Sequence, residues 1–245
     1  MDISNYIDFT LLKASTSERD IIDLCHVAKT KNYYSVCISS CFVALAKQLL
    51  EDSNVKICSV VGFPLGSMST EAKVFEAQKA VKDGADEIDM VINLGYLKSR
   101  NHVSVLKDIT DVKMAIESTP LKVILEISEL SKNEIIKASE ICIDANADFI
   151  KTSTGFSKSG ATLTAVKIIK KTIRNKAKIK ASGGIHDFET AIKYIDAGAE
   201  RIGTSKIIKS KNNQRQIRNT EIYTDYIETV LNKKPTTTIE TKSNV

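Results

Sequence analysis

The chain has 245 residues, of which 42% are hydrophobic and 27% charged, and its net charge is +5. Length and composition are those of a globular protein with one large domain or two small ones, and they exclude a disordered chain. No apolar run reaches the roughly 18 residues of a transmembrane helix, and the N-terminus "MDISNYIDFT" lacks the layout of a secretion signal. We therefore expect a cytoplasmic protein that does not bind membranes.

The small excess of positive charge does not by itself indicate nucleic-acid binding. Aromatic residues make up only 6% of the chain, whereas base stacking requires exposed rings beside the charge. We expect no nucleic-acid partner, and an anionic small substrate fits the charge equally well. Five cysteines without a CxxC pair and three widely spaced histidines favour reduced, buried thiols, and we expect no metal site.

Short apolar runs alternate with longer amphipathic ones along the chain. Several short runs are rich in Val and Ile and apolar nearly throughout, which is typical of parallel strands covered on both faces. The expected strands cover residues 6–12, 34–39, 56–63, 87–93, 122–128, 148–153, 178–182 and 201–205.

Sequence patterns typical of helices, such as capping residues before amphipathic stretches, lie between these runs. Ser69 precedes one amphipathic stretch, and Ser131 with Glu134 forms a capping box ahead of another. Asp187 is placed to cap a later helix, which Gly198 would end.

Eight strands alternating with eight helices in about 250 residues predict a TIM (β/α)8 barrel. We expect one barrel domain over residues 1–232 and a disordered tail, "KKPTTTIETKSNV", over residues 233–245. The alternative is a doubly wound open sheet. Such a sheet usually places its glycine-rich loop after the first strand, whereas glycines here gather after the last three.

Two neighbouring expected strands carry a lysine at or near their ends. Lys151 ends the sixth strand and Lys180 lies in the seventh. Neighbouring strands lie about 4.8 Å apart, so two lysines facing the barrel interior would feel each other's charge. Like charge and burial favour the neutral amine, which alone can attack a carbonyl. The pair predicts a Schiff-base site; the alternative is that both lysines flank strand ends and reach solvent.

Hydroxyl- and glycine-rich loops follow the last three expected strands. They read "TSTG" at 152–155, "SGG" at 182–184 and "GTS" at 203–205. In barrels, the loops after the last strands commonly hold phosphate. Each loop alone could be a simple turn, but together they predict a phosphorylated carbonyl substrate.

A carboxylate interrupts the apolar run "EIDMVIN" at Asp89. Burying it is costly unless it is paired, so Asp89 either moves protons or belongs to a structural ion pair. Asp8, Thr10 and Glu126 are weaker candidates of the same kind.

In order and spacing, "VVGFPLG", "EIDMVIN", "FIKTSTGF", "KASGGI" and "RIGTS" resemble deoxyribose-phosphate aldolase from Tyr6 to Ile208. The resemblance implies a class I aldolase that needs no metal or cofactor. It would cleave 2-deoxy-D-ribose 5-phosphate reversibly to acetaldehyde and D-glyceraldehyde 3-phosphate, in deoxynucleoside catabolism. A homodimer or higher homo-oligomer is implied as well.

The resemblance also implies roles for single residues. Lys151 matches the Schiff-base lysine, Lys180 the second lysine that tunes it, and Asp89 the proton-relay aspartate. The phosphate-binding loops match at Thr154, Gly155, Gly183, Gly184, Gly203 and Ser205.

The chain departs from the family pattern at three places. Phe9 stands where many relatives carry histidine, and Ser39–Ser40 where a polar residue and proline are usual. Lys206 stands where small residues are common, and either reaches the phosphate or faces solvent. Two alternatives remain open: a Schiff-base aldolase for another phosphorylated sugar, and a non-catalytic sugar-phosphate-binding barrel.

Overall fold

A closed ring of parallel strands forms the centre of the computed structural model, which describes residues 2–208. The strands pair in sequence order, and β8 closes the ring on β1. They are β1 (Ile7–Thr10), β2 (Ser35–Ile38), β3 (Lys56–Val61), β4 (Glu87–Val91), β5 (Leu121–Ile124), β6 (Phe149–Lys151), β7 (Lys178–Ser182) and β8 (Arg201–Thr204). Each overlaps the run predicted for it, and the predicted barrel is confirmed.

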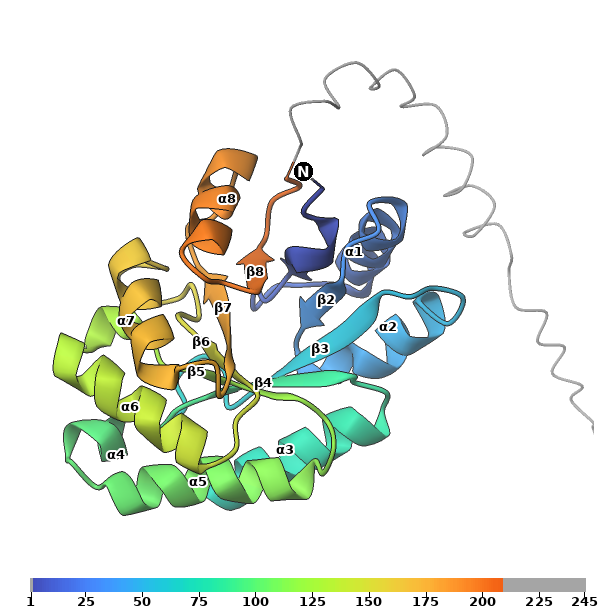
Figure 1. Cartoon of the computed structure of the whole chain (residues 1–245). Helices are drawn as coiled ribbons and strands as arrows, with labels where there is room; N and C mark the ends of the chain where they lie inside the picture. Colours follow the sequence, from blue (N-terminus) through green and yellow to red (C-terminus); the bar gives the residue numbers. More distant parts are fainter. Residues whose placement is uncertain (1, 209–245) are drawn as a thin grey trace, which may run out of the picture. The chain divides into compact units, whose positions relative to one another are not determined.

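Helices surround the strands (Figure 1). Within residues 2–208 they are α1 (Glu18–Thr30), α2 (Val43–Leu49), α3 (Thr70–Lys82), α4 (Leu94–Lys98), α5 (His102–Ala115), α6 (Lys132–Asp144), α7 (Leu163–Ile173) and α8 (Phe188–Asp196). Both α4 and α5 stand between β4 and β5, so the predicted alternation is not strict there. The predicted boundary at 232 and tail at 233–245 lie outside the described residues.

The predicted capping residues begin their helices. Ser131 and Glu134 form the capping box of α6, and the side chains of Ser69 and Asp187 accept backbone hydrogen bonds at the starts of α3 and α8. Gly198 follows α8 with φ +108°, a left-handed conformation that suits glycine. No helix between residues 2 and 208 is long and apolar enough to cross a membrane.

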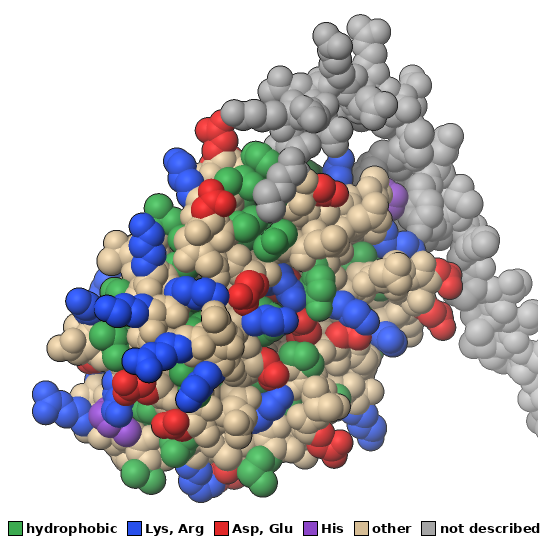
Figure 2. All heavy atoms as spheres, in the orientation of Figure 1, with side chains coloured by type: hydrophobic (Ala, Val, Ile, Leu, Met, Phe, Trp, Pro, Cys, Tyr) green, Lys and Arg blue, Asp and Glu red, His purple; other side chains and the backbone are tan. Residues whose placement is uncertain are grey.

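A buried ion pair ties α3 to α5 and β4. The Lys73 ammonium, fully buried, lies 2.6 Å from Asp108 of α5 and donates to the Val91 carbonyl at 3.0 Å. At the surface, basic side chains are interspersed with acidic and hydrophobic ones on the face shown in Figure 2. Lysines pair with acids at the surface as well, for example Lys98 with Glu134 at 2.8 Å.

The strands alternate between two buried environments. Ile88, Val123 and Ile150 belong to the main hydrophobic core, while the adjacent Asp89, Lys122 and Lys151 are also buried and contact one another across strands. Because successive side chains of a strand point to opposite faces, the barrel has an apolar outer layer and a charged interior.

Candidate active site

Asp89 of β4 is the centre of this charged interior. Its Oδ2 accepts hydrogen bonds from the ammonium groups of Lys151 and Lys180, each at 2.8 Å, and its Oδ1 accepts one from Lys122 at 2.9 Å. All four side chains are at most 2% exposed. Burial opposes the negative charge, but the three lysines hold the pKa of Asp89 well below its usual range.

Lys151 and Lys180 face the same interior. They stand opposite each other in the register of β6 and β7, and both nitrogens lie 2.8 Å from one oxygen of Asp89. The two nitrogens are therefore separated by no more than twice that distance. The structure thus brings together the three residues that the motifs single out.

Asp8 of β1 anchors Lys180 from the other side. Its Oδ2 lies 2.5 Å from the Lys180 nitrogen, and its Oδ1 accepts hydrogen bonds from Ser35 at 2.7 Å and Arg201 at 2.8 Å. Although burial lowers the pKa of Lys180, Asp8 and Asp89 together raise it well above its ordinary value. This environment therefore favours the charged form of Lys180. Thr10, by contrast, donates its hydroxyl to the backbone carbonyl of Asp8.

Two cations of this cluster were not predicted from the sequence. Lys122 of β5 lies 2.7 Å from Glu87 as well as 2.9 Å from Asp89. Arg201 contacts Asp8 at 2.8 Å and Glu87 at 3.1 Å, and its guanidinium lies 3.5 Å from the centre of the Tyr34 ring. Both stand at or near strand starts, where a basic residue ordinarily reaches solvent.

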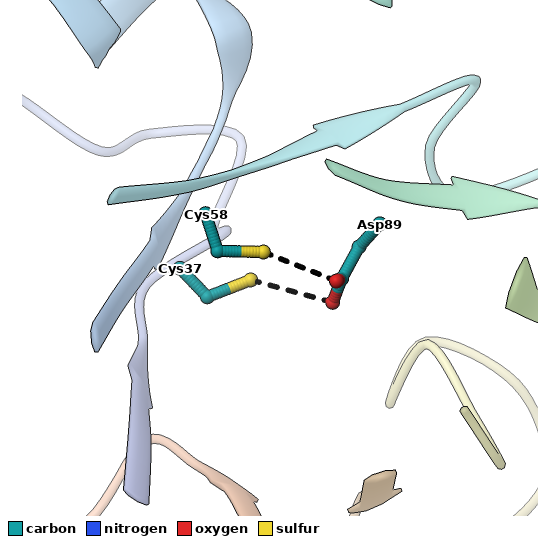
Figure 3. A group of neighbouring side chains, drawn as sticks. All are labelled: Cys37, Cys58 and Asp89. Atoms are coloured by element: carbon teal, nitrogen blue, oxygen red, sulfur yellow. Dashed lines mark hydrogen bonds between the residues drawn. The ribbon is translucent and has the colours of Figure 1, made fainter. Parts of the chain in front are cut away.

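Two thiols complete the surroundings of Asp89 (Figure 3). Cys58 Sγ lies 3.1 Å from Oδ1, and Cys37 Sγ lies 3.8 Å from Oδ2. A hydrogen bond from Cys58 lowers the pKa of Cys37 to about 7 against the effect of burial, whereas burial raises the pKa of Cys58. The prediction of cysteines as buried hydrophobes is wrong for Cys41, which is exposed.

The glycine-rich loops differ in how open they are. Gly155 and Gly184 have φ of +87° and +79° and open space where a side chain would stand, so a ligand has room to approach the backbone there. Gly203 instead leaves room for its neighbours on β7, because a Cβ on it would lie 2.8 Å from Cβ of Ser182 and 3.2 Å from Cε of Lys180. Gly183 packs closely against Gly160, and Ser205 is exposed.

Thr154 is held by Glu126. Both the backbone N–H and the hydroxyl of Thr154 donate to Oε2 of this carboxylate, which is buried and stands just after the end of β5 at Ile124. Glu126 has a left-handed backbone, with φ +57°, a costly conformation that clusters at functional sites. Its Oε1 is buried without a hydrogen-bond partner within residues 2–208. The backbone N–H and hydroxyl of Thr154 are therefore already bonded to the Glu126 carboxylate. This fits poorly with a contact between Thr154 and the substrate phosphate.

The chain belongs to the DeoC/LacD family of aldolases, whose family model matches residues 5–206. The predicted resemblance and the predicted aldolase are confirmed by this match. Curated relatives named deoxyribose-phosphate aldolase include one from Finegoldia magna, 51% identical over 85% of this chain and 98% of its own. Another, from Mycoplasma capricolum, is 48% identical over 83% of this chain and 91% of its own.

Solved structures agree with this assignment. "QR15, an Aldolase" is 46% identical with a TM-score of 0.81, covering 84% of this chain and 92% of its own. A putative deoxyribose-phosphate aldolase from Coccidioides immitis is 39% identical with a TM-score of 0.82, and the match covers 83% of this chain and 82% of that one.

Proposed function

We propose that this chain is a class I aldolase that cleaves 2-deoxy-D-ribose 5-phosphate to acetaldehyde and D-glyceraldehyde 3-phosphate, with Lys151 as the nucleophile. One observation carries the choice of lysine. Lys122 pairs with Glu87 and Asp89, and Lys180 pairs with Asp8 and Asp89. Within the described part of the chain, Lys151 pairs with Asp89 alone.

Because Lys151 has fewer carboxylate partners than Lys122 or Lys180, fewer ion pairs are lost when its nitrogen reacts. It is also the last residue of its strand, and the carboxyl ends of barrel strands are where active sites lie. Two carboxylates hold Lys180 positive, and its charge disfavours a second positive charge on a nearby amine. The electrostatics of the cluster thus support Lys151 as nucleophile and Lys180 as the residue that tunes it.

The reaction follows from this arrangement. The Lys151 nitrogen adds to the C1 aldehyde of the open-chain sugar, and loss of water gives an iminium. When the C3 hydroxyl loses its proton, the C3 oxygen forms a carbonyl and the electrons of the C2–C3 bond pass into the iminium, leaving an enamine. Asp89 and Lys180, with a water, are the groups placed to move this proton. Protonation at C2 and hydrolysis release acetaldehyde and regenerate the amine.

The substrate phosphate is proposed to bind at the loops after β6, β7 and β8. The open backbone at Gly155 and Gly184, the exposed Ser205 and the neighbouring Lys206 support this placement. Thr154 is better assigned to positioning, because its donors are held by Glu126. Gly203 is better assigned to making room for Ser182 and Lys180.

Borohydride trapping tests the proposal. Reduction in the presence of acetaldehyde should leave one stable adduct, and peptide mapping should place it on Lys151. Lys151→Met should lose the adduct, whereas Lys178→Met, an exposed lysine of β7, should retain it. An adduct on Lys180 or Lys122 would overturn the assignment. A trap with acetaldehyde but no cleavage of deoxyribose 5-phosphate would favour an aldolase for another phosphorylated sugar, and no adduct at all would favour a non-catalytic barrel.

We also propose that the chain forms a homo-oligomer. A deoxyribose phosphate aldolase from Aeropyrum pernix, 32% identical with a TM-score of 0.77, is described as tetrameric. Phe75 and Met114, each 72% exposed on α3 and α5, supply apolar surface suited to an interface. Light scattering coupled to size-exclusion chromatography would measure the mass, and a monomer at enzyme-assay concentration would contradict the proposal.

A further inference from the structure

We infer that Cys37, Cys58 and Asp89 form an inhibitory binding site for a thiophilic divalent cation such as Zn²⁺. The two cysteines stand opposite each other in the register of β2 and β3. Their sulfurs and a carboxylate oxygen of Asp89 all lie within 4.8 Å of one another, and all three residues are buried. The proposed aldolase chemistry gives neither thiol a role.

The spacing fits tetrahedral zinc. Zinc bound at its usual distances to sulfur and to a carboxylate oxygen holds these atoms about 3.6 Å apart. Cys58 Sγ lies 3.1 Å from Oδ1 of Asp89 and Cys37 Sγ lies 3.8 Å from Oδ2, one distance on either side of that value. Each sulfur faces a different oxygen of the carboxylate (Figure 3), so one cation between them would contact all three side chains.

Charge balance answers the main objection, which is that three ammonium groups surround Asp89. Binding Zn²⁺ converts both thiols to thiolates, so one doubly charged cation enters as two protons leave and the net charge is unchanged. The metal takes the place of the two S–H protons. Lys122, whose nitrogen lies 3.4 Å from Cys58 Sγ, would stabilise the thiolate. Hard cations such as Mg²⁺ gain nothing from sulfur, so the donor set selects a softer ion.

Inhibition rests on the proposed function, whereas binding does not. A cation on Asp89 would hold the carboxylate that we assign to proton transfer, and it would lie beside the lysines bonded to the same group. We therefore expect metal binding and loss of turnover to occur together, at one cation per chain.

Cobalt substitution tests the site without reference to activity. Co²⁺ added to the metal-free full chain should give a thiolate-to-cobalt charge-transfer band that saturates at one equivalent and disappears when Zn²⁺ is added. Cys58→Ala and Cys37→Ala each remove one ligand and should bind at least about 100-fold more weakly, since even partners outside the metal's ligand shell are worth roughly 10–100-fold. Cys41→Ser removes an exposed thiol and should retain the band.

The cobalt spectrum and the activity measurements test the metal site, its inhibitory role and the proposed function separately. No thiolate band in the wild-type chain, or a band that persists in Cys58→Ala, would refute the site. A band at this site without inhibition of deoxyribose 5-phosphate cleavage by equimolar Zn²⁺ would refute the inhibitory role. Absence of aldolase activity in the metal-free chain would refute the proposed function, while the cobalt spectrum would still test the site.

Discussion

Lys122 offers the sharpest test of the charged interior. Its fully buried ammonium lies 2.7 Å from Glu87 and 2.9 Å from Asp89, and Lys122→Met removes the charge while keeping most of the volume. Removing one partner of a buried ion pair costs about 3–5 kcal/mol. We expect the lower end, about 3 kcal/mol, because Glu87 retains Arg201 and Asp89 retains its two other lysines.

Urea denaturation followed by circular dichroism would measure this loss. For a chain of this size the same change corresponds to a fall of roughly 6–12 °C in Tm. Lys56→Met is the matched control, because Lys56 also stands in a strand but is half-exposed, 3.5 Å from Asp86. Such a surface pair contributes less than about 1 kcal/mol. Equal losses in the two variants would refute the argument that the interior charges hold one another.

The pH dependence of stability distinguishes the loss of the Lys122 charge from the loss of its packing. The pKa of Asp89 is lowered in the folded protein, with Lys122 the leading cation. A carboxylate with a lowered folded pKa contributes stability that is present above its unfolded pKa, about 3.9, and lost as the pH falls through the folded pKa. Removing Lys122 raises that folded pKa and reduces the contribution. The unfolded pKa is the same in both proteins, so the stability difference between wild type and variant should shrink as the pH falls through the raised folded pKa of Asp89 in the variant. A difference that stays constant down to acid unfolding would indicate lost packing instead.

Three further variants test neighbouring parts of the argument. Lys180→Leu should lower kcat at least about 100-fold with little change in KM, and normal turnover would show that the second lysine is dispensable. Glu126→Ala frees both donors of Thr154 and should cost about 1.5–3 kcal/mol of stability, whereas Glu126→Gln, which keeps an acceptor, should cost less; equal losses would contradict the contact. Lys73→Met breaks the buried pair with Asp108 and should cost about 3 kcal/mol while leaving kcat/KM nearly unchanged, so a large fall in kcat/KM would place α3 in catalysis.

The fold could be predicted because its signals are local. Strands buried on both faces appear as short apolar runs, and Ser69, Ser131 and Asp187 mark helix starts by contacts within three residues. Lys151 and Asp89 stood out for the same reason, since each interrupts or ends an apolar run. None of these inferences requires knowledge of which strands are neighbours.

Lys122 could not be found in this way, because its burial depends on strand pairing. Lys56 and Lys178 also stand at strand starts, and both are exposed. Lys122 is buried because it stands second in β5, opposite Asp89 in the register of β4 and β5. The thiols were missed for a related reason, since only pairing places Cys37 and Cys58 side by side against Asp89.

The buried charged side chains have more ion-pair partners near the strand starts than near the strand ends. Arg201 and Glu87, the first residues of their strands, contact each other, and Arg201 also holds Asp8. Asp8 in turn holds Lys180, whereas Lys151, at the end of its strand, has one carboxylate partner in the described structure. Substitutions near the strand starts should therefore lower mainly stability, and substitutions near the strand ends should lower mainly turnover. The proposed nucleophile therefore stands where the network of ion pairs has its fewest partners.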